Sequence, residues 1–137
     1  MELKRINDRV SVSPQIRPED LPAIKAAGFT SIVNNRPDGE APDQPSGAEI
    51  RAAAEAMGLA YHEIPLGRSG VSSDMVDATR QVLDNCDGAT LCYCRSGTRS
   101  TTLWALSQAG RVPADEIIEA AGHAGYDVSH LAGHLGS

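Results

Sequence analysis

The sequence lacks an excess of basic residues. Its 137 residues include 18 Asp and Glu against 12 Lys and Arg, which gives a formal net charge of −6. Because nucleic-acid phosphates and anionic lipid headgroups attract basic surfaces, this balance argues against nucleic acid and a charged membrane as partners. An anionic substrate would therefore have to be held by a local positive pocket.

Long apolar runs and abundant cysteine are also missing. No stretch approaches the roughly 20 apolar residues that a membrane-spanning helix needs. The first nine residues carry charges where a secretory signal would have its apolar region. Three cysteines, Cys86, Cys92 and Cys94, are an odd and sparse set for a secreted disulfide scaffold. We therefore expect reduced thiols, a cytoplasmic location and no membrane partner.

Repeats and low-complexity stretches are absent, and short strand-like segments alternate with helix-like ones. The length fits one domain over residues 1–137. The alternation favours an α/β domain with a largely parallel sheet. We expect strands at 9–13, 29–34, 60–64 and 89–93, the first at an edge of the sheet because Pro14 limits it. The expected helices cover 18–27, 46–57, 72–85, 97–109, a segment starting at 113, and 127–135.

The most informative segment is 91–100, where an apolar strand ends at Cys94 and a short loop leads into a helix. Such a loop points the first N–H groups of the helix at the space above it, and this positive end favours a thiolate at Cys94. Gly97 lets successive N–H groups converge on one anion. Arg95 and Arg99 flank the thiol, and the planar fork of Arg99 can hold two oxygens. We therefore predict an activated thiolate beneath an anion-binding loop formed by Arg95, Ser96, Gly97 and Thr98.

Other polar residues give weaker signals. Residues 34–40 follow a central strand at the carboxyl edge of the sheet, so we expect Asn35 and Arg36 to border the site. Asp38 could do the same or simply form a turn. We interpret Cys92 as a core residue, because a disulfide with its near neighbour would be strained. His130 and His134 lack a nearby third ligand, so no metal is expected.

The motifs resemble one bacterial family. Residues 94–100, C-R-S-G-T-R-S, resemble the active-site loop of cysteine-based phosphatases and rhodaneses. With V-S-V-S-P-Q-I at 10–16 and I-V-N-N-R-P-D-G-E at 32–40, the chain resembles the phosphatase-like domain of β-lactamase-hydrolase-like proteins (DUF442-type), also described as sulfur transferases. This resemblance covers essentially the whole chain. It implies a dual-specificity-phosphatase-like fold, with a mostly parallel sheet of four to five strands flanked by helices, and a Ser100 hydroxyl bonded to the Cys94 thiolate.

Two departures from the phosphatases favour sulfur transfer. Phosphatases of this architecture use C-x5-R, whereas four residues separate Cys94 from Arg99, as in the single-domain rhodanese loop. The position that aligns with the phosphatase general acid is Arg68, and a guanidinium cannot donate a proton near neutral pH. Arg68 could instead bind an anionic sulfur donor. Asp74, the next carboxylate, is better explained as an acid in the first turn of a helix.

We therefore expect a cysteine-dependent sulfurtransferase with the catalytic residues Cys94, Arg99 and Ser100. Its Cys94 persulfide would carry sulfur from thiosulfate or another small anionic or persulfide donor to an acceptor thiol, without metal or organic cofactor. This interpretation allows a sulfide-oxidising enzyme as a partner. Two alternatives stay open. One is a phosphatase that forms a phosphocysteine, and the other is a non-catalytic module that binds an anion or senses redox state.

Overall fold

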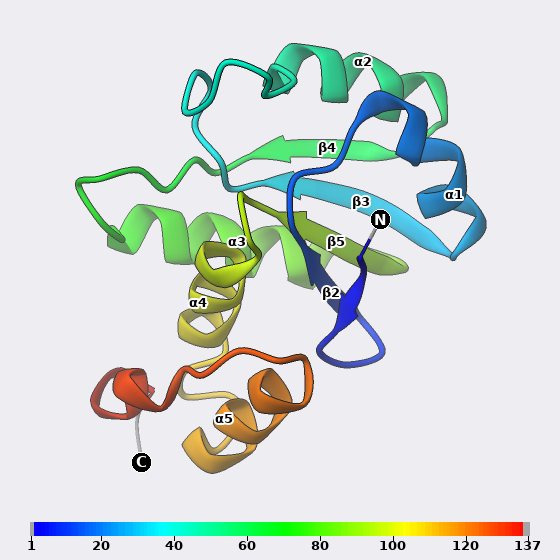
Figure 1. Ribbon diagram of the computed structural model, residues 1–137. Coiled ribbons are helices and arrows are strands. Elements are labelled where there is room, and N and C mark those ends of the chain that lie inside the picture. Colours follow the sequence, from blue (N-terminus) through cyan, green and yellow to red (C-terminus); the bar gives the residue numbers. More distant parts are fainter. Residues whose placement is uncertain (1, 136–137) are drawn as a thin grey trace.

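A central sheet organises the computed structural model, which describes residues 2–135 (Figure 1). Within that range five strands pair in the order β1-β2-β5-β3-β4. β1 is antiparallel to β2, and the other neighbouring pairs are parallel. The strands are β1 (Lys4–Arg5), β2 (Val10–Ser13), β3 (Phe29–Asn34), β4 (Ala60–Glu63) and β5 (Ala89–Tyr93). The expected α/β class with a mostly parallel sheet is confirmed.

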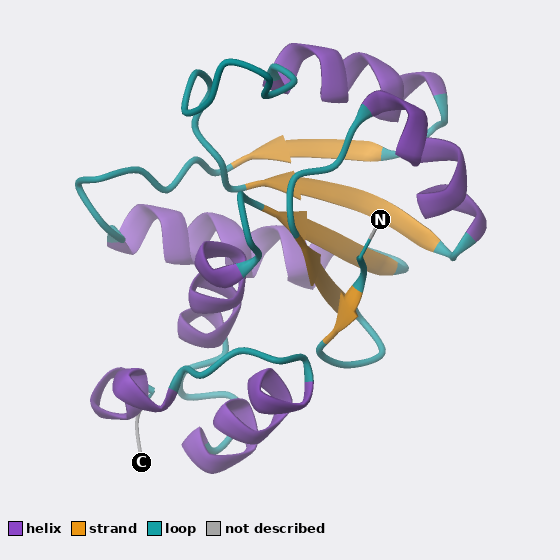
Figure 2. Cartoon of the chain, viewed as in Figure 1, coloured by secondary structure: helices purple, strands orange, loops and turns teal. Residues whose placement is uncertain are grey.

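Helices cover both faces of this sheet (Figure 2). One face packs against α1 (Leu21–Ala26), which continues the short 3-10 helix η1 (Pro18–Asp20), and against α2 (Gly47–Ala56). The other face packs against α3 (Ser73–Asn85), α4 (Thr98–Ser107) and α5 (Ala114–His123). A second 3-10 helix, η2 (Ser129–His134), follows α5. No helix within residues 2–135 is long and apolar enough to cross a membrane.

Alternate residues of the central strands fill two separate cores. Cys92 and its β3 neighbour Val33 face α3, α4 and α5, whereas Leu91 and Ile32 face α1 and α2. This is the two-residue period of a strand, applied to a sheet that is buried on both faces. It explains why the predicted strands read as nearly continuous apolar runs.

One prediction about the first strand is wrong, and the last expected helix is of another type than the α-helix. The strand expected at a sheet edge is β2, which has β1 on one side and β5 on the other and is buried at all four positions. The two-residue β1 has no periodicity to reveal it; it is held by a turn in which Asn7 Oδ1 accepts the N–H groups of Arg9 and Val10. The last expected helix, 127–135, is instead the 3-10 helix η2, a tighter form that is common in short pieces, and the glycine within it disfavours a regular α-helix.

The parallel register brings three strand ends together. Tyr93, the last residue of β5, lies between Ser13 at the end of β2 and Asn34 at the end of β3. The loops that leave these ends therefore meet at the carboxyl edge of the sheet. Ligands bind at this edge in open α/β folds.

Candidate active site

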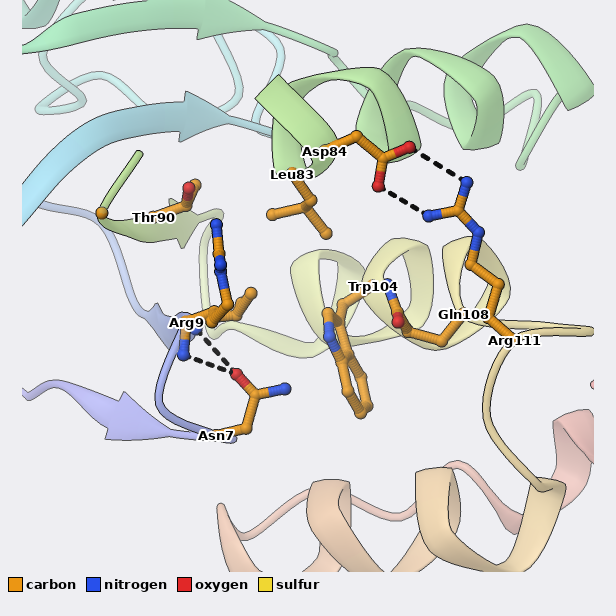
Figure 3. A pocket seen from close by; sticks show the side chains of 10 residues that line it. Asn7, Arg9, Leu83, Asp84, Thr90, Trp104, Gln108 and Arg111 are labelled. Atoms are coloured by element: carbon orange, nitrogen blue, oxygen red, sulfur yellow. Dashed lines mark hydrogen bonds and ion pairs between the residues drawn. The ribbon is translucent and has the colours of Figure 1, made fainter. Parts of the chain in front are cut away.

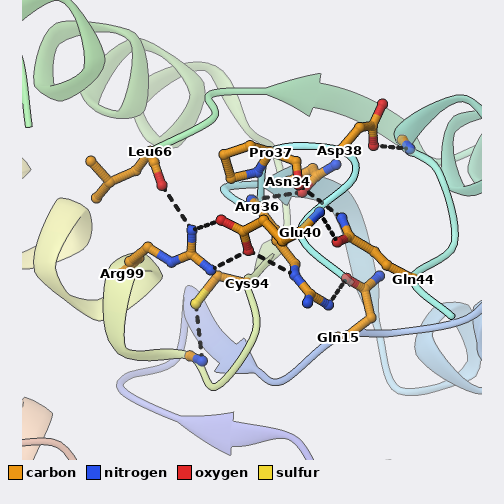
Figure 4. A network of polar contacts seen from close by, with 12 residues as sticks. Gln15, Asn34, Arg36, Pro37, Asp38, Glu40, Gln44, Leu66, Cys94 and Arg99 are labelled. Carbon is orange, nitrogen blue, oxygen red and sulfur yellow. Dashed lines mark hydrogen bonds and ion pairs between the residues drawn. The ribbon is translucent and has the colours of Figure 1, made fainter. Parts of the chain in front are cut away.

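The loop after β5 curls around the sulfur of Cys94 (Figure 4). The Cys94 side chain is fully buried, and its Sγ accepts a hydrogen bond from the Gly97 N–H at 3.0 Å. Gly97 has φ +94°, a left-handed conformation that side-chain-bearing residues rarely adopt, and α4 begins at the next residue. The predicted arrangement of cysteine, glycine turn and helix start is therefore present. At least one backbone donor faces the sulfur.

Arg99, in the first turn of α4, is held from two other loops. Its Nη1 donates to Glu40 Oε2 at 2.8 Å and to the Leu66 carbonyl at 2.9 Å, and its Nη2 donates to Glu40 Oε1 at 2.8 Å. A guanidinium has five N–H donors, so these bonds use three. Within residues 2–135 no oxygen accepts from the Arg99 Nε–H or the second Nη2 hydrogen, and the nearby Cys94 sulfur acts on the guanidinium by charge and by hydrogen bonding, which helps to raise the Arg99 pKa. Arg99 therefore keeps two donors that could bind an oxyanion.

Glu40 is the site residue that the sequence analysis missed. Its Oε1 also accepts from Arg36 Nε at 3.0 Å, and Arg36 Nη1 donates in turn to Gln15 at 3.1 Å (Figure 4). The pKa of Glu40 is lowered from 4.5 to about 2, chiefly by the hydrogen bond from Arg99 and, against opposing burial, also by Arg36. The pKa of Arg99 is raised, first by Glu40 and further by the negative charge of Cys94. Glu40 thus positions Arg99 and stays ionised at neutral pH.

The two residues expected to border the site from the loop after β3 have other roles. Asn35 is buried, and its Nδ2 donates to the Ile64 carbonyl at 2.9 Å, so it joins strand ends. Arg36 is only 6% exposed and is engaged by Glu40, which makes it a positioning residue rather than an open anion site. Asp38 accepts the Gly47 N–H at 2.8 Å and so links this loop to the start of α2. The side chains of residues next to a sheet edge can point into the protein instead of into the site, and the sequence does not reveal which.

A cleft of about 510 Å³ opens beside the loop. Of the described residues that line it, Arg68, Arg95 and Arg99 are cationic and Glu40 is the one carboxylate. Arg68 and Arg95 are exposed. The cleft is therefore the local positive pocket that an acidic chain needs to attract an anion, and it joins two of the predicted binding residues to the predicted catalytic arginine.

The hydroxyl groups of the loop differ from expectation. Ser96 Oγ donates to Thr98 Oγ1 at 3.1 Å, and both residues are exposed. Ser100 Oγ is buried and has no hydrogen-bond partner within the described part of the chain. The bond from Ser100 to the Cys94 sulfur that the family resemblance implies is therefore not formed in this structure.

The other candidate groups lie outside the chemistry. Cys92 is 2% exposed in the core, and burial, with smaller contributions from the other two cysteines, raises the pKa of its thiol to about 12. All three cysteines are free, so the interpretation of Cys92 as a core residue is confirmed. Asp74 lies in the first turn of α3, as expected. His130 and His134 are exposed, and across residues 2–135 no three His, Cys, Asp or Glu side chains gather as metal ligands.

A second hollow is remote from this loop. It lies between α3, α4 and the start of β2, and its walls include Arg9, Trp104 and the ion pair of Arg111 with Asp84 (Figure 3). Val10 and Thr90, at the amino-terminal ends of β2 and β5, also line it. It therefore opens at the sheet edge opposite Cys94 and contributes nothing to the chemistry there.

Glu40→Gln is expected to lower turnover roughly tenfold, because the amide keeps the shape but loses the charge that orients Arg99. Since the pKa of Glu40 is depressed to about 2, its stabilising effect is complete above pH 4.5 and is lost as the pH falls toward 2. The difference in unfolding free energy between the two proteins should therefore be largest near neutral pH and shrink in acid. Urea unfolding at several pH values measures it. The control is Glu55→Gln, which removes a carboxylate from the exposed ion pair with Arg51. Equal activity of Glu40→Gln and the wild type would contradict the role of Glu40 in positioning Arg99.

Known proteins match most of this chain. Residues 2–111 match the family model described as "Beta-lactamase hydrolase-like protein, phosphatase-like domain". Beta-lactamase hydrolase-like proteins from Xylella fastidiosa (strain Temecula1) and Agrobacterium fabrum (strain C58) are 37% and 35% identical to it over 131 and 130 residues, 93% of this chain in each case. The chain spans only 30% of the length of these curated relatives.

Solved structures show the same architecture. A "putative phosphatase" from Neisseria meningitidis Z2491 superposes with a TM-score of 0.84 at 31% identity, covering 98% of this chain and 96% of that one. A mutant form of Tk-PTP has a TM-score of 0.75 at 17% identity and covers 98% and 91%, a likeness of fold alone. The family predicted from the motifs is confirmed: the chain belongs to the phosphatase-like domains of β-lactamase-hydrolase-like proteins, and its fold is that of the cysteine-based phosphatases.

Proposed function

We propose that this chain is a cysteine-dependent phosphoester hydrolase. The observation that carries the proposal is the Cys94 sulfur, bound by the Gly97 N–H, in a loop whose helix presents Arg99 with two N–H donors that no oxygen of the described residues accepts. The family description and the structural relatives, which carry phosphatase names, support the same chemistry. They favour it over the sulfur transfer that the loop spacing suggests.

The reaction would proceed through a covalent intermediate. The Cys94 thiolate attacks phosphorus, an S–P bond forms, and the P–O bond to the leaving group breaks. Water then attacks phosphorus, the S–P bond breaks, and inorganic phosphate and the thiolate are released. The free donors of Arg99 bind the non-bridging oxygens as charge develops on them. Arg68 and Arg95 attract the dianion into the cleft.

The cleft offers no obvious proton donor for the leaving oxygen. Glu40 is the one carboxylate among the described residues that line it, and a pKa of about 2 keeps Glu40 ionised near neutral pH. A general acid works best when its pKa lies near the working pH. We therefore infer substrates whose leaving oxygen needs no proton, such as aryl or acyl phosphates.

A series of aryl phosphates with phenols of increasing acidity tests this function. The kcat/KM is expected to rise steeply with phenol acidity, and an alkyl phosphate should be hydrolysed roughly 100-fold or more slowly, the usual contribution of a general acid. Rates that do not depend on the leaving group would show that an acid does act. Absence of hydrolysis that depends on Cys94, with every ester of the series, would overturn the proposal.

Sulfur transfer is the second candidate, and the missing acid is also the observation that favours it. The Cys94 thiolate would attack the outer sulfur of thiosulfate, an S–S bond would form, and sulfite would leave with the electron pair. The outer sulfur would then pass to cyanide or to an acceptor thiol. Neither step needs a protonated carboxyl group. Thiocyanate formation by a preparation that hydrolyses no phosphoester would favour this reaction, and a sulfide-oxidising enzyme would then be a reasonable partner to test.

A further inference from the structure

A tyrosine from beyond the family-matched residues 2–111 reaches the active-site loop. α5 ends in a left-handed Gly125, φ +99°, and the next residue, Tyr126, donates its backbone N–H to Ala121 at 2.9 Å. Ala124 and Val128, on either side, are buried in the same core cluster as α4. The position of Tyr126 is therefore set by packing as well as by the turn.

The hydroxyl group of Tyr126 meets one peptide unit of the loop. Its Oη donates to the Ser96 carbonyl at 2.8 Å. A Cβ added at Gly97 would overlap this hydroxyl, so the ring lies directly against the Ser96–Gly97 peptide. The N–H of that same peptide belongs to Gly97 and donates to Cys94 Sγ at 3.0 Å. One peptide unit thus accepts from Tyr126 at one end and donates to the nucleophile at the other.

Turn geometry allows a second orientation of this peptide. Gly97, with φ +94° and ψ −12°, has the angles of the third residue of a type II turn, and rotating the preceding peptide plane converts such a turn to type I. Glycine adopts both conformations easily. After rotation the Gly97 N–H would point away from Cys94, and the Ser96 carbonyl would turn toward a negative sulfur. The bond from Tyr126 can form only in the orientation observed.

The environment of the Tyr126 hydroxyl keeps it a hydrogen-bond donor. Burial first, then the charge of Cys94 and that of the Glu2 carboxylate, raise the pKa of Tyr126, so its hydroxyl stays protonated. The other titratable groups that respond to the Cys94 charge are Arg99 on α4 and Cys92 on β5. Neither contacts the Ser96 carbonyl through an assigned hydrogen bond within residues 2–135. Hydrogen bonds at both ends of a peptide also polarise it and strengthen each other.

We propose that Tyr126 is a positioning residue that locks the Ser96–Gly97 peptide with its N–H toward Cys94 Sγ, and so keeps a backbone hydrogen-bond donor on the nucleophile. The inference rests on the proposed function only in taking Cys94 as the reacting group. It applies equally to phosphoryl and sulfur transfer. Its test can therefore be made without any substrate.

The test is the pH dependence of Cys94 alkylation by iodoacetamide in Tyr126→Phe, followed by peptide mass spectrometry from about pH 5 to about pH 10. The variant keeps the ring and loses one hydrogen bond. Near pH 6 its alkylation should be roughly fivefold slower than in the wild type, and the rates should converge at high pH, where both thiols are ionised. Turnover of an aryl phosphate should fall by a similar factor. Tyr61→Phe, which loses a hydroxyl bonded to Glu63, is the matched control and should leave the alkylation curve unchanged.

Alkylation curves of Tyr126→Phe and wild type that superimpose would overturn the proposal, whatever happens to turnover. A shift shared by Tyr61→Phe would overturn it as well, because the effect would then be general. A shifted curve in a protein that hydrolyses no phosphoester would leave this inference standing while the proposed function fails. Equal melting temperatures establish that both variants are folded.

Discussion

Cys94→Ser is expected to abolish aryl phosphate hydrolysis, with a fall in kcat of about 10⁴-fold or more. A serine hydroxyl would occupy the place of the sulfur, but within residues 2–135 no carboxylate or imidazole is hydrogen-bonded there to remove its proton. The Gly97 N–H that stabilises a thiolate is far too weak a partner to ionise an alcohol. The variant should still bind phosphate, because the loop amides and Arg99 are unchanged. Steady-state kinetics measure the loss of turnover, and titration calorimetry with inorganic phosphate measures binding to the inactive variant.

The matched control for this substitution is Cys86→Ser. Cys86 is half-buried at the end of α3, where its sulfur lies 3.2 Å from Thr30 Oγ1 and 3.3 Å from Ser31 Oγ. A serine hydroxyl can make the same contacts, so activity should be retained. If Cys94→Ser kept a tenth of the wild-type activity, another nucleophile would have to be sought.

Arg99→Lys is expected to reduce kcat/KM by about 100- to 1,000-fold. Lysine carries the same charge, but its single ammonium group cannot donate to both oxygens of Glu40 and still offer donors to a substrate. Most of the loss should appear in kcat, because the guanidinium hydrogen bonds stabilise the oxygens of the transition state more than those of the bound substrate. If only the positive charge of Arg99 mattered, and not the geometry of its guanidinium, the effect of Arg99→Lys would be much smaller.

Arg68→Lys is the comparison that separates a role of charge alone from a role of guanidinium geometry. Arg68 is exposed in the same cleft and has no assigned hydrogen bond to Glu40 within the described residues. As an attracting charge it should be replaceable by lysine with less than about a tenfold change, mainly in KM. Equal losses for Arg99→Lys and Arg68→Lys would contradict the assignment of Arg99 to the transition state.

The part of the site that is contiguous in sequence was predictable. Cys94, Gly97 and Arg99 lie within six residues, and a strand, a left-handed turn and a helix start dictate how they meet. The same local rules locate β3, β4 and β5. They locate β2 as well, but not its interior place in the sheet, which depends on the two-residue β1 pairing beside it.

The residues that hold the site in shape could not be predicted, because their contacts are distant in sequence. Glu40 meets Arg99 across 59 positions, and Tyr126 meets Ser96 across 30. Asn35 and Arg36 show the opposite error. Both follow a strand at the correct edge, yet the backbone directs their side chains inward to the Ile64 carbonyl, Glu40 and Gln15. Spacing along the chain contains neither kind of information.

The central claim is that Cys94 forms a covalent bond to the transferred group. Rapid acid quenching during turnover of an aryl phosphate, followed by intact-protein and peptide mass spectrometry, tests it most directly. One added phosphoryl group is expected on Cys94 and none in Cys94→Ser. An unmodified Cys94 during rapid hydrolysis would contradict it. If the protein never becomes phosphorylated but gains one sulfur atom on incubation with thiosulfate, and loses it on adding cyanide, the site catalyses sulfur transfer instead.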